Sequence, residues 1–112
     1  ILETRAPDGY SGEIKILVGI DKNGNILGTR VIKHKETPGL GDFIDYNKSD
    51  WIDIFTYSSL KNTPEIEWAV KKDQGKFDYI SGATITARAV VKAINEALNF
   101  FKKNKLEMGL DV

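Results

Sequence analysis

The chain has 112 residues, of which 41% are hydrophobic and 29% are charged, a composition typical of one globular domain. Sixteen Lys and Arg residues balance sixteen Asp and Glu residues, so the basic surplus that nucleic acid or anionic lipid requires of a main partner is absent. With no cysteine and one histidine, the sequence excludes disulfides, iron–sulfur clusters, cysteine-ligated zinc, a catalytic thiol and a His-rich metal site. No stretch approaches the roughly 18 apolar residues of a membrane span. Because the chain starts at Ile1, we expect a processed chain or an excised fragment, with any membrane anchor outside it.

Two strands joined by a tight turn form the clearest pattern in the first half of the chain. Apolar residues alternate from Ile14 to Ile20, which predicts a strand over residues 12–20 with one apolar face. The loop of residues 21–25 contains an Asn-Gly pair, which readily supplies the positive φ angles of a hairpin turn. β-Branched residues then favour a second strand over residues 26–34.

Weaker signals describe the middle of the chain. In chain order, we expect an irregular start over residues 1–11, a glycine–proline loop over 35–41, a short helix over 50–55 capped by Ser49, a loop over 58–64, a strand over 66–70, a turn over 71–75 and an extended piece over 77–80. Trp51 and Trp68 are assigned to the core, because aromatic side chains of this size usually build it.

The strongest pattern predicts a helix over residues 85–103. Its apolar stripe, at spacings of three and four, consists of Ala87, Val90, Val91, Ile94, Ala97, Leu98 and Phe101. Polar residues, Arg88 among them, occupy the other face, and lysines gather at the C-terminal end, where they complement the helix dipole. The whole predicts a single α+β domain over residues 1–112, with an antiparallel hairpin or sheet packed against a long C-terminal helix.

The segment Asp78-Tyr79-Ile80-Ser81-Gly82-Ala83-Thr84 leads directly into this helix. The first N–H groups of a helix have no intrahelical partner and carry the positive end of its dipole, so a phosphate placed there would meet several donors. Ser81, Thr84 and Thr86 add hydroxyls, and Gly82 lets the backbone approach a ligand closely. Ser and Thr are also ordinary helix caps, so the residues alone leave a phosphate site and a cap as alternatives.

Several blocks of the sequence resemble one family of flavoprotein domains. Residues 78–84 fit Asp-x-x-Ser/Thr-Gly-Ala-Thr, the acceptor pattern for covalent flavin attachment in the FMN-binding domains of the RnfG and NqrC subunits of bacterial ion-translocating respiratory complexes. Upstream, Glu36-Thr37-Pro38-Gly39-Leu40-Gly41 is similar to the Glu-Thr-Pro-Gly-Leu-Gly loop of the same family. Residues 9–12 are similar to the family's domain opening, whereas residues 49–51 and 68–72 look like RnfG segments. The chain therefore resembles RnfG more closely than NqrC.

The resemblance implies a covalently bound FMN. In this family a flavin transferase, supplied with FAD, joins the FMN phosphate to the last threonine of the motif, which is Thr84 in this sequence. The residues that would surround the phosphate are Ser81, Gly82, Ala83 and Thr86. Asp78 matches the acidic position of the motif and would serve recognition by the transferase, although Asp is also a common turn residue.

The same resemblance suggests contacts for the isoalloxazine ring. The candidates are Glu36, Thr37, Leu40 and Gly41. Their glycine–proline loop could hold backbone N–H and C=O groups against the polar edge of the ring, while Leu40 packs on its face. A loop chosen only for its shape is the alternative. Lys72 could approach the flavin or its phosphate as a cation, although a lysine in such a turn is more often solvated.

Family resemblance further implies a non-autonomous electron-transfer subunit. No Gly-x-Gly-x-x-Gly opens a helix after a strand, so nothing in the chain indicates a nicotinamide site. The chain would belong to an Rnf-type complex, with the other Rnf subunits as partners, that couples electron transfer between ferredoxin and NAD to ion translocation. It would lie on the extracytoplasmic (periplasmic) face of the bacterial inner membrane, held by an N-terminal anchor outside this chain.

Other functions are compatible with parts of the pattern. Within the family, the chain could be an NqrC-like subunit of the sodium-pumping quinone reductase, or a flavin domain of a regulatory membrane protein. A flavin-free interaction or ligand-binding module could keep the same fold. A hydrolase could use Glu36 and Asp42 as paired carboxylates, but carboxylates are too common to favour this function.

Overall fold

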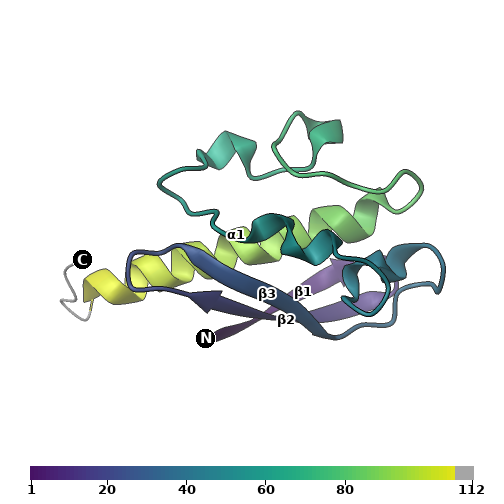
Figure 1. Ribbon diagram of the computed structural model, residues 1–112, viewed down its shortest axis with the longest axis horizontal. Coiled ribbons are helices and arrows are strands. Elements are labelled where there is room, and N and C mark those ends of the chain that lie inside the picture. Colours follow the sequence, from purple (N-terminus) through teal and green to yellow (C-terminus); the bar gives the residue numbers. More distant parts are fainter. Residues whose placement is uncertain (108–112) are drawn as a thin grey trace.

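The computed structural model describes residues 1–107 and has the predicted α+β architecture. Three antiparallel strands form a sheet in the order β1 (Leu2–Gly9), β2 (Gly12–Ile20) and β3 (Ile26–Lys33). The segment between β3 and the C-terminal helix contains four short 3-10 helices, η1 (Gly41–Ile44), η2 (Trp51–Phe55), η3 (Glu65–Glu67) and η4 (Lys71–Asp73). Helix α1 (Thr84–Glu107) runs between the sheet and the irregular segment of residues 60–80, drawn in teal and green (Figure 1).

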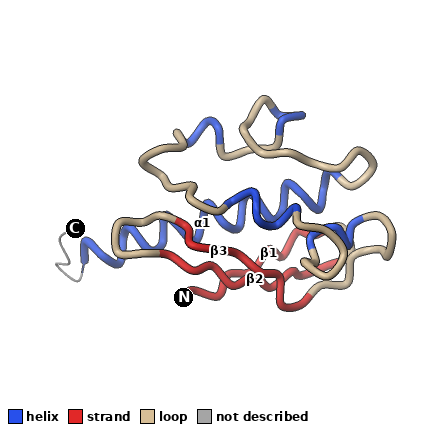
Figure 2. The backbone as a smooth tube through the Cα atoms, in the orientation of Figure 1, coloured by secondary structure: helices blue, strands red, loops and turns tan. Residues whose placement is uncertain are grey.

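The hairpin of β2 and β3 is confirmed. Ile16 pairs with Val31 and Val18 pairs with Thr29, and the inward-facing side chains of β2 at both positions are fully buried. In the connecting turn, the Asp21 carboxylate accepts the amide protons of residues 23 and 25, at 2.9 and 3.0 Å. The tube drawing shows this turn beside the C-terminal end of α1 (Figure 2).

The irregular start expected over residues 1–11 is wrong, because most of these residues form β1. The strand pairs with β2 through Thr4 opposite Ile16 and Ala6 opposite Ile14. Charged residues alternate with small ones along it, so its local apolar pattern is weak. The strand forms because β2 supplies its hydrogen bonds and α1 packs against it, burying Ala6. Pro7 is tolerated because β1 is an edge strand.

The strand expected over residues 66–70 is also wrong. The chain forms a 3-10 turn there, with the Glu67 amide donating to the Pro64 carbonyl at 2.8 Å, and Ile66 is 84% exposed. A single parallel bridge joins Val70 to Phe77, and it is all that remains of the extended piece expected over residues 77–80. The alternating apolar residues indicated a strand, but no neighbouring strand in the described residues pairs with them along their length.

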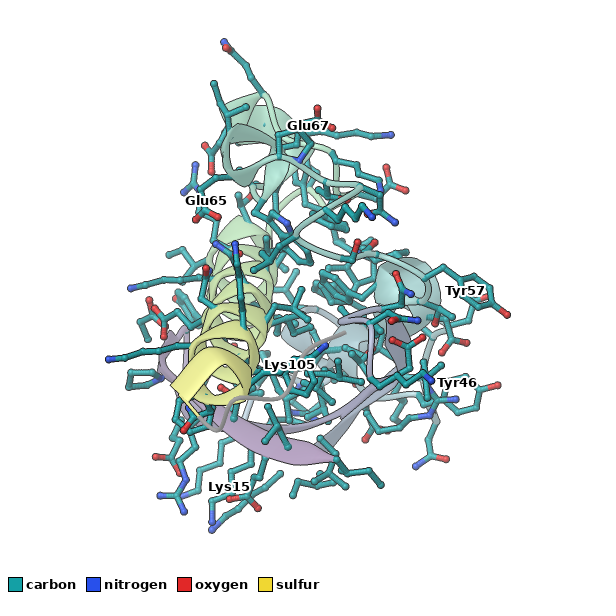
Figure 3. All side chains as sticks on the ribbon, turned by 90° about the vertical axis from the view of Figure 1, so that its left-hand side faces the viewer. Lys15, Tyr46, Tyr57, Glu65, Glu67 and Lys105 are labelled. Atoms are coloured by element: carbon teal, nitrogen blue, oxygen red, sulfur yellow. The ribbon has the colours of Figure 1, made fainter. Side chains whose placement is uncertain are left out.

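The short helix expected over residues 50–55 is a 3-10 helix, η2, whose first amide, that of Trp51, donates to the Ser49 hydroxyl at 3.1 Å. The long helix begins and ends slightly beyond the predicted residues 85–103, and the predicted stripe faces inward with only its last member, Phe101, partly exposed. Seen from the C-terminal end of α1, Lys105 marks the helix end, Lys15 lies on the sheet side, and Glu65 and Glu67 lie on the opposite side of the helix (Figure 3).

An aromatic cluster fills the core beside α1, and one of its members is hydrogen-bonded to the segment that leads into this helix. The ring centroids of Phe55 and Phe77 are 4.9 Å apart, as are those of Trp68 and Phe77. Trp51 packs edge-on against Phe55 at 5.5 Å, and its indole N–H donates to the Asp78 carbonyl at 2.9 Å. Both tryptophans are 6% exposed, which confirms their assignment to the core.

We expect Phe55→Ala to lower the free energy of unfolding by about 3–5 kcal/mol, because Phe55 is fully buried at the centre of this cluster. Phe100→Ala is the matched control, since this phenylalanine is 57% exposed, and it should cost less than about 1 kcal/mol. Urea denaturation followed by tryptophan fluorescence measures both. Equal losses in the two variants would contradict the central place of the cluster.

Candidate functional site

A cavity of about 350 Å³ lies at the N-terminal end of α1. Four separate segments of the chain line it, through Tyr10, Thr37, Leu40, Gly41, Lys72, Gly82, Ala83, Thr84, Ile85, Thr86 and Arg88. This volume is within the range of about 300–1,000 Å³ that is usual for small-molecule sites.

The start of α1 presents free amide donors at this cavity. The Ala83 amide donates to the Ile80 carbonyl at 2.9 Å and closes the turn, with Gly82 at its tip in the left-handed region (φ +88°). The first helical bond runs from the residue 87 amide to the Ala83 carbonyl. Within residues 1–107, the amides of residues 84–86 therefore have no acceptor, and they lie at the positive end of the helix dipole. Thr84 is half-buried, and its hydroxyl also has no partner in that part of the chain.

The glycine–proline loop lies against this helix start. The Thr37 carbonyl accepts the amides of Leu40 and Gly41, at 3.1 and 3.0 Å. A Cβ atom on Gly41 would lie 3.0 Å from the Glu36 Cβ and 3.1 Å from the Thr86 hydroxyl oxygen, so a larger residue there would push the loop and the helix start apart by a few tenths of an ångström. Leu40 is 43% exposed and reaches the acceptor turn, since its Cδ1 would be 3.6 Å from a Cβ on Gly82. The two sequence motifs thus meet at one cavity.

Glu36 lies beneath the cavity wall and is 4% exposed. Its Oε1 accepts the Tyr10 amide at 3.0 Å and the Thr86 hydroxyl at 2.6 Å, and its Oε2 accepts the Ser11 amide at 2.8 Å. One carboxylate therefore joins the β1–β2 turn, the glycine–proline loop and the first turn of α1.

Two cationic side chains, those of Lys72 and Arg88, line the cavity. Arg88 donates from Nε and Nη2 to the two oxygens of Asp73, both at 2.7 Å. These hydrogen bonds lower the pKa of the Asp73 carboxyl and raise the pKa of Arg88. Lys72 precedes Asp73 in η4 and lines the same cavity. The cavity lining thus includes one lysine and one arginine that is paired with a carboxylate.

The structure brings most of the predicted site residues together. Those that line the cavity are Thr37, Leu40, Gly41, Lys72, Gly82, Ala83, Thr84 and Thr86. The other three predicted residues, Ser81, Glu36 and Asp78, are not among the lining residues. Ser81 is exposed in the turn, and Asp78 pairs on the surface with Lys71 at 2.7 Å. The roles of all these residues toward a ligand stay predictions.

Three lining residues were not predicted: Tyr10, Ile85 and Arg88. Arg88 stands four residues after Thr84, and helical spacing could have placed it on the same face. Arg88 lies on the predicted polar face of the helix and is exposed there, but that face borders the cavity. Nothing local indicates Tyr10, which reaches the cavity because the β1–β2 turn is bound to Glu36.

Comparison with known proteins identifies the family. A family model described as FMN-binding domain matches residues 9–99, and the chain belongs to this family. Relatives described as the G subunit of the ion-translocating oxidoreductase complex include that of Pseudomonas aeruginosa strain UCBPP-PA14, which is 53% identical over 105 residues, covering 94% of this chain and 49% of the relative. The Yersinia pestis protein of the same description is 58% identical over 96 residues, covering 86% of this chain and 46% of the relative. The chain thus spans about half the length of the curated relatives that it matches.

A solved structure supports the fold. The crystal structure of Shewanella oneidensis NqrC aligns with a TM-score of 0.62 and 26% sequence identity, over 82% of this chain and 45% of that chain. The predicted family and fold are therefore confirmed. Within residues 1–107, no helix is long and apolar enough to cross a membrane.

The Asp73–Arg88 pair makes the cavity wall sensitive to acid. Because the pKa of Asp73 is lower in the folded chain than its ordinary value of about 3.9, the pair stabilises the fold above that pH, and this contribution is lost as the pH falls through the lowered pKa. We expect the Asp73 carboxyl carbon, followed by NMR, to titrate below its ordinary range, and to return toward it in Arg88→Gln. Arg5→Gln removes a remote arginine and should leave the titration unchanged. An unchanged titration in Arg88→Gln would contradict the assigned cause.

Proposed function

We propose that this chain carries FMN in the cavity at the start of α1, joined through its phosphate to Thr84, and acts as an electron-transfer subunit of an Rnf-type ion-translocating complex. The observation that carries this proposal is the convergence of the Ser81–Thr84 turn and the Glu36–Gly41 loop on one cavity, in a chain of the FMN-binding domain family. The two motifs are far apart in sequence, and each has the composition that the family uses.

The donors at the cavity fit a phosphate. The amides of residues 84–86 have no acceptor within residues 1–107, and Gly82 leaves the approach to them free of a side chain. Arg88 uses only part of its fork of donors on Asp73, and Lys72 adds a second cation nearby. Ser81 would lie at the edge of this phosphate site, and Thr86 would shape its floor.

Attachment requires a hydroxyl at Thr84. In the proposed maturation step, the Thr84 oxygen attacks the flavin-side phosphorus of FAD on the flavin transferase. A phosphoester bond forms, the pyrophosphate bond breaks, AMP leaves and the hydroxyl proton is released. Thr84 suits this step because it is only half-buried and its hydroxyl is not held by another side chain of residues 1–107. Asp78 is exposed beside the acceptor turn, where the transferase could contact it.

The remaining walls fit the flavin ring. Tyr10, Leu40 and Ile85 are large apolar side chains that are 68%, 43% and 48% exposed, and all three line the cavity. Thr37 and Gly41 lie in the loop between these walls and could offer backbone groups to the polar edge of the ring. When bound, FMN supplies reversible electron transfer, and the chain's own residues position it and shape its electrostatic surroundings.

The place in a complex rests on the relatives. Proteins at 53% and 58% identity are described as the G subunit of an ion-translocating oxidoreductase complex, whereas NqrC is a structural neighbour at 26% identity, which favours the Rnf-type assignment over an NqrC-like one. We extend the proposal to the other Rnf subunits as partners, to electron transfer between ferredoxin and NAD, and to an anchored position on the extracytoplasmic face of the inner membrane.

Intact mass tests the attachment. After export alongside an active flavin transferase, the chain should gain the mass of FMN minus one water, and peptide mapping should locate it on the peptide that carries Thr84. Thr84→Ala should abolish the gain without changing the fold, because a half-exposed threonine contributes little to stability. Thr56→Ala is the matched control, since it removes the hydroxyl of another half-buried threonine that does not line the cavity, and it should still be modified.

An unmodified chain, with the transferase active on a control protein, would refute the covalent link. If the chain also bound no added FMN, a flavin-free binding module of the same fold would become the better assignment. Copurification with sodium-pumping quinone reductase subunits, in place of Rnf subunits, would identify the chain as NqrC-like.

A further inference from the structure

The carboxylate of Glu36 is buried next to the site but does not line the cavity. Both of its oxygens are engaged, by the consecutive amides of Tyr10 and Ser11 and by the Thr86 hydroxyl, at 2.6–3.0 Å. Two successive amides directed at one anion form the kind of backbone nest that binds phosphate in other proteins. Here the chain's own side chain fills that nest.

The three donors come from segments that are far apart in the sequence. Tyr10 and Ser11 belong to the turn between β1 and β2, while Thr86 belongs to the first turn of α1. Tyr10 and Thr86 both line the cavity, so the carboxylate links two of its walls from below. Glu36 is itself held, because its amide donates to His34 Nδ1 at 3.1 Å.

We infer that Glu36 is a positioning residue for the flavin site, which sets the distance between the Tyr10 wall and the first turn of α1 and does not contact the flavin. This inference rests on the proposed function and replaces the ring contact expected for Glu36 from the sequence. Charge-assisted hydrogen bonds suit this role, since they are stronger and geometrically stricter than neutral ones.

The direction in which Glu36→Gln changes the affinity for FMN distinguishes a positioning role from an electrostatic one. A carboxylate beneath the helix start repels a phosphate at Thr84, so removing its charge alone would strengthen FMN binding. Glu36→Gln also turns one acceptor into an NH₂ donor that faces a backbone N–H, which releases at least one of the amides of Tyr10 and Ser11. If positioning dominates, FMN binding weakens in spite of the lost repulsion.

The test uses the 112-residue chain with Thr84→Ala as the parent, so that FMN binding stays non-covalent, and follows FMN fluorescence during titration. Glu36→Gln should weaken the affinity for FMN by about tenfold, the loss expected for one hydrogen bond to a charged group. Glu67→Gln, an equal change of charge at an exposed residue of η3, should leave it unchanged. Hydrogen exchange followed by NMR should show faster exchange of the Tyr10 and Ser11 amides in Glu36→Gln only.

A second pair of variants covers the case in which Glu36→Gln fails to fold. Thr86→Val has the same shape but lacks the hydroxyl, and it should weaken FMN binding by about three- to tenfold. Thr86→Ser keeps the hydroxyl and should restore binding close to that of the parent.

Unchanged or stronger FMN binding in Glu36→Gln, or equal binding in Thr86→Val and Thr86→Ser, would overturn the positioning role. Unchanged exchange of the Tyr10 and Ser11 amides would overturn the hydrogen-bond link itself. If the parent bound no FMN and an active transferase also left the unmutated chain unmodified, the proposed function would fail and the positioning role with it, although protected Tyr10 and Ser11 amides would leave the hydrogen-bond link standing.

Discussion

Burial of the apolar face of α1 is the constraint on which the rest of the structure depends. The helix packs on β1 and β2 of the sheet, while aromatic side chains of the irregular segment between β3 and α1 belong to the same buried cluster as its apolar residues. A helix of 24 residues is about 36 Å long, so its two ends are far apart. In this arrangement the N-terminus of the helix lies beside the β1–β2 turn and the glycine–proline loop.

The site is built where these segments meet. Each wall comes from a different part of the chain, and each is short and irregular: a strand turn, a loop, a 3-10 turn and the start of a helix. Irregular backbone of this kind is normally mobile unless side chains hold it. Here the side-chain hydrogen bonds of Glu36 and of the Asp73–Arg88 pair join these segments.

The errors in the sequence analysis have a common physical cause. β1 was missed because an edge strand with charged outward residues and Pro7 has little apolar pattern of its own, and its ladder bonds come from β2. The strand predicted over residues 66–70 does not form because a strand needs a partner along its length, and within residues 1–107 only Val70 has one. Local patterns predict the structure correctly where an element has a continuous apolar face, as the hairpin and the long helix do.

The family, the hairpin, the long helix and the acceptor turn can be predicted from the amino-acid sequence, because each is encoded by residues close together in the chain. That Glu36 lies beneath the cavity and that Tyr10 lines it follows only from the three-dimensional structure. Those placements depend on contacts between residues 25 to 50 positions apart, such as the bonds of Glu36 to Ser11 and Thr86. Such contacts join segments that are far apart in the chain, so periodicity and spacing carry no record of them.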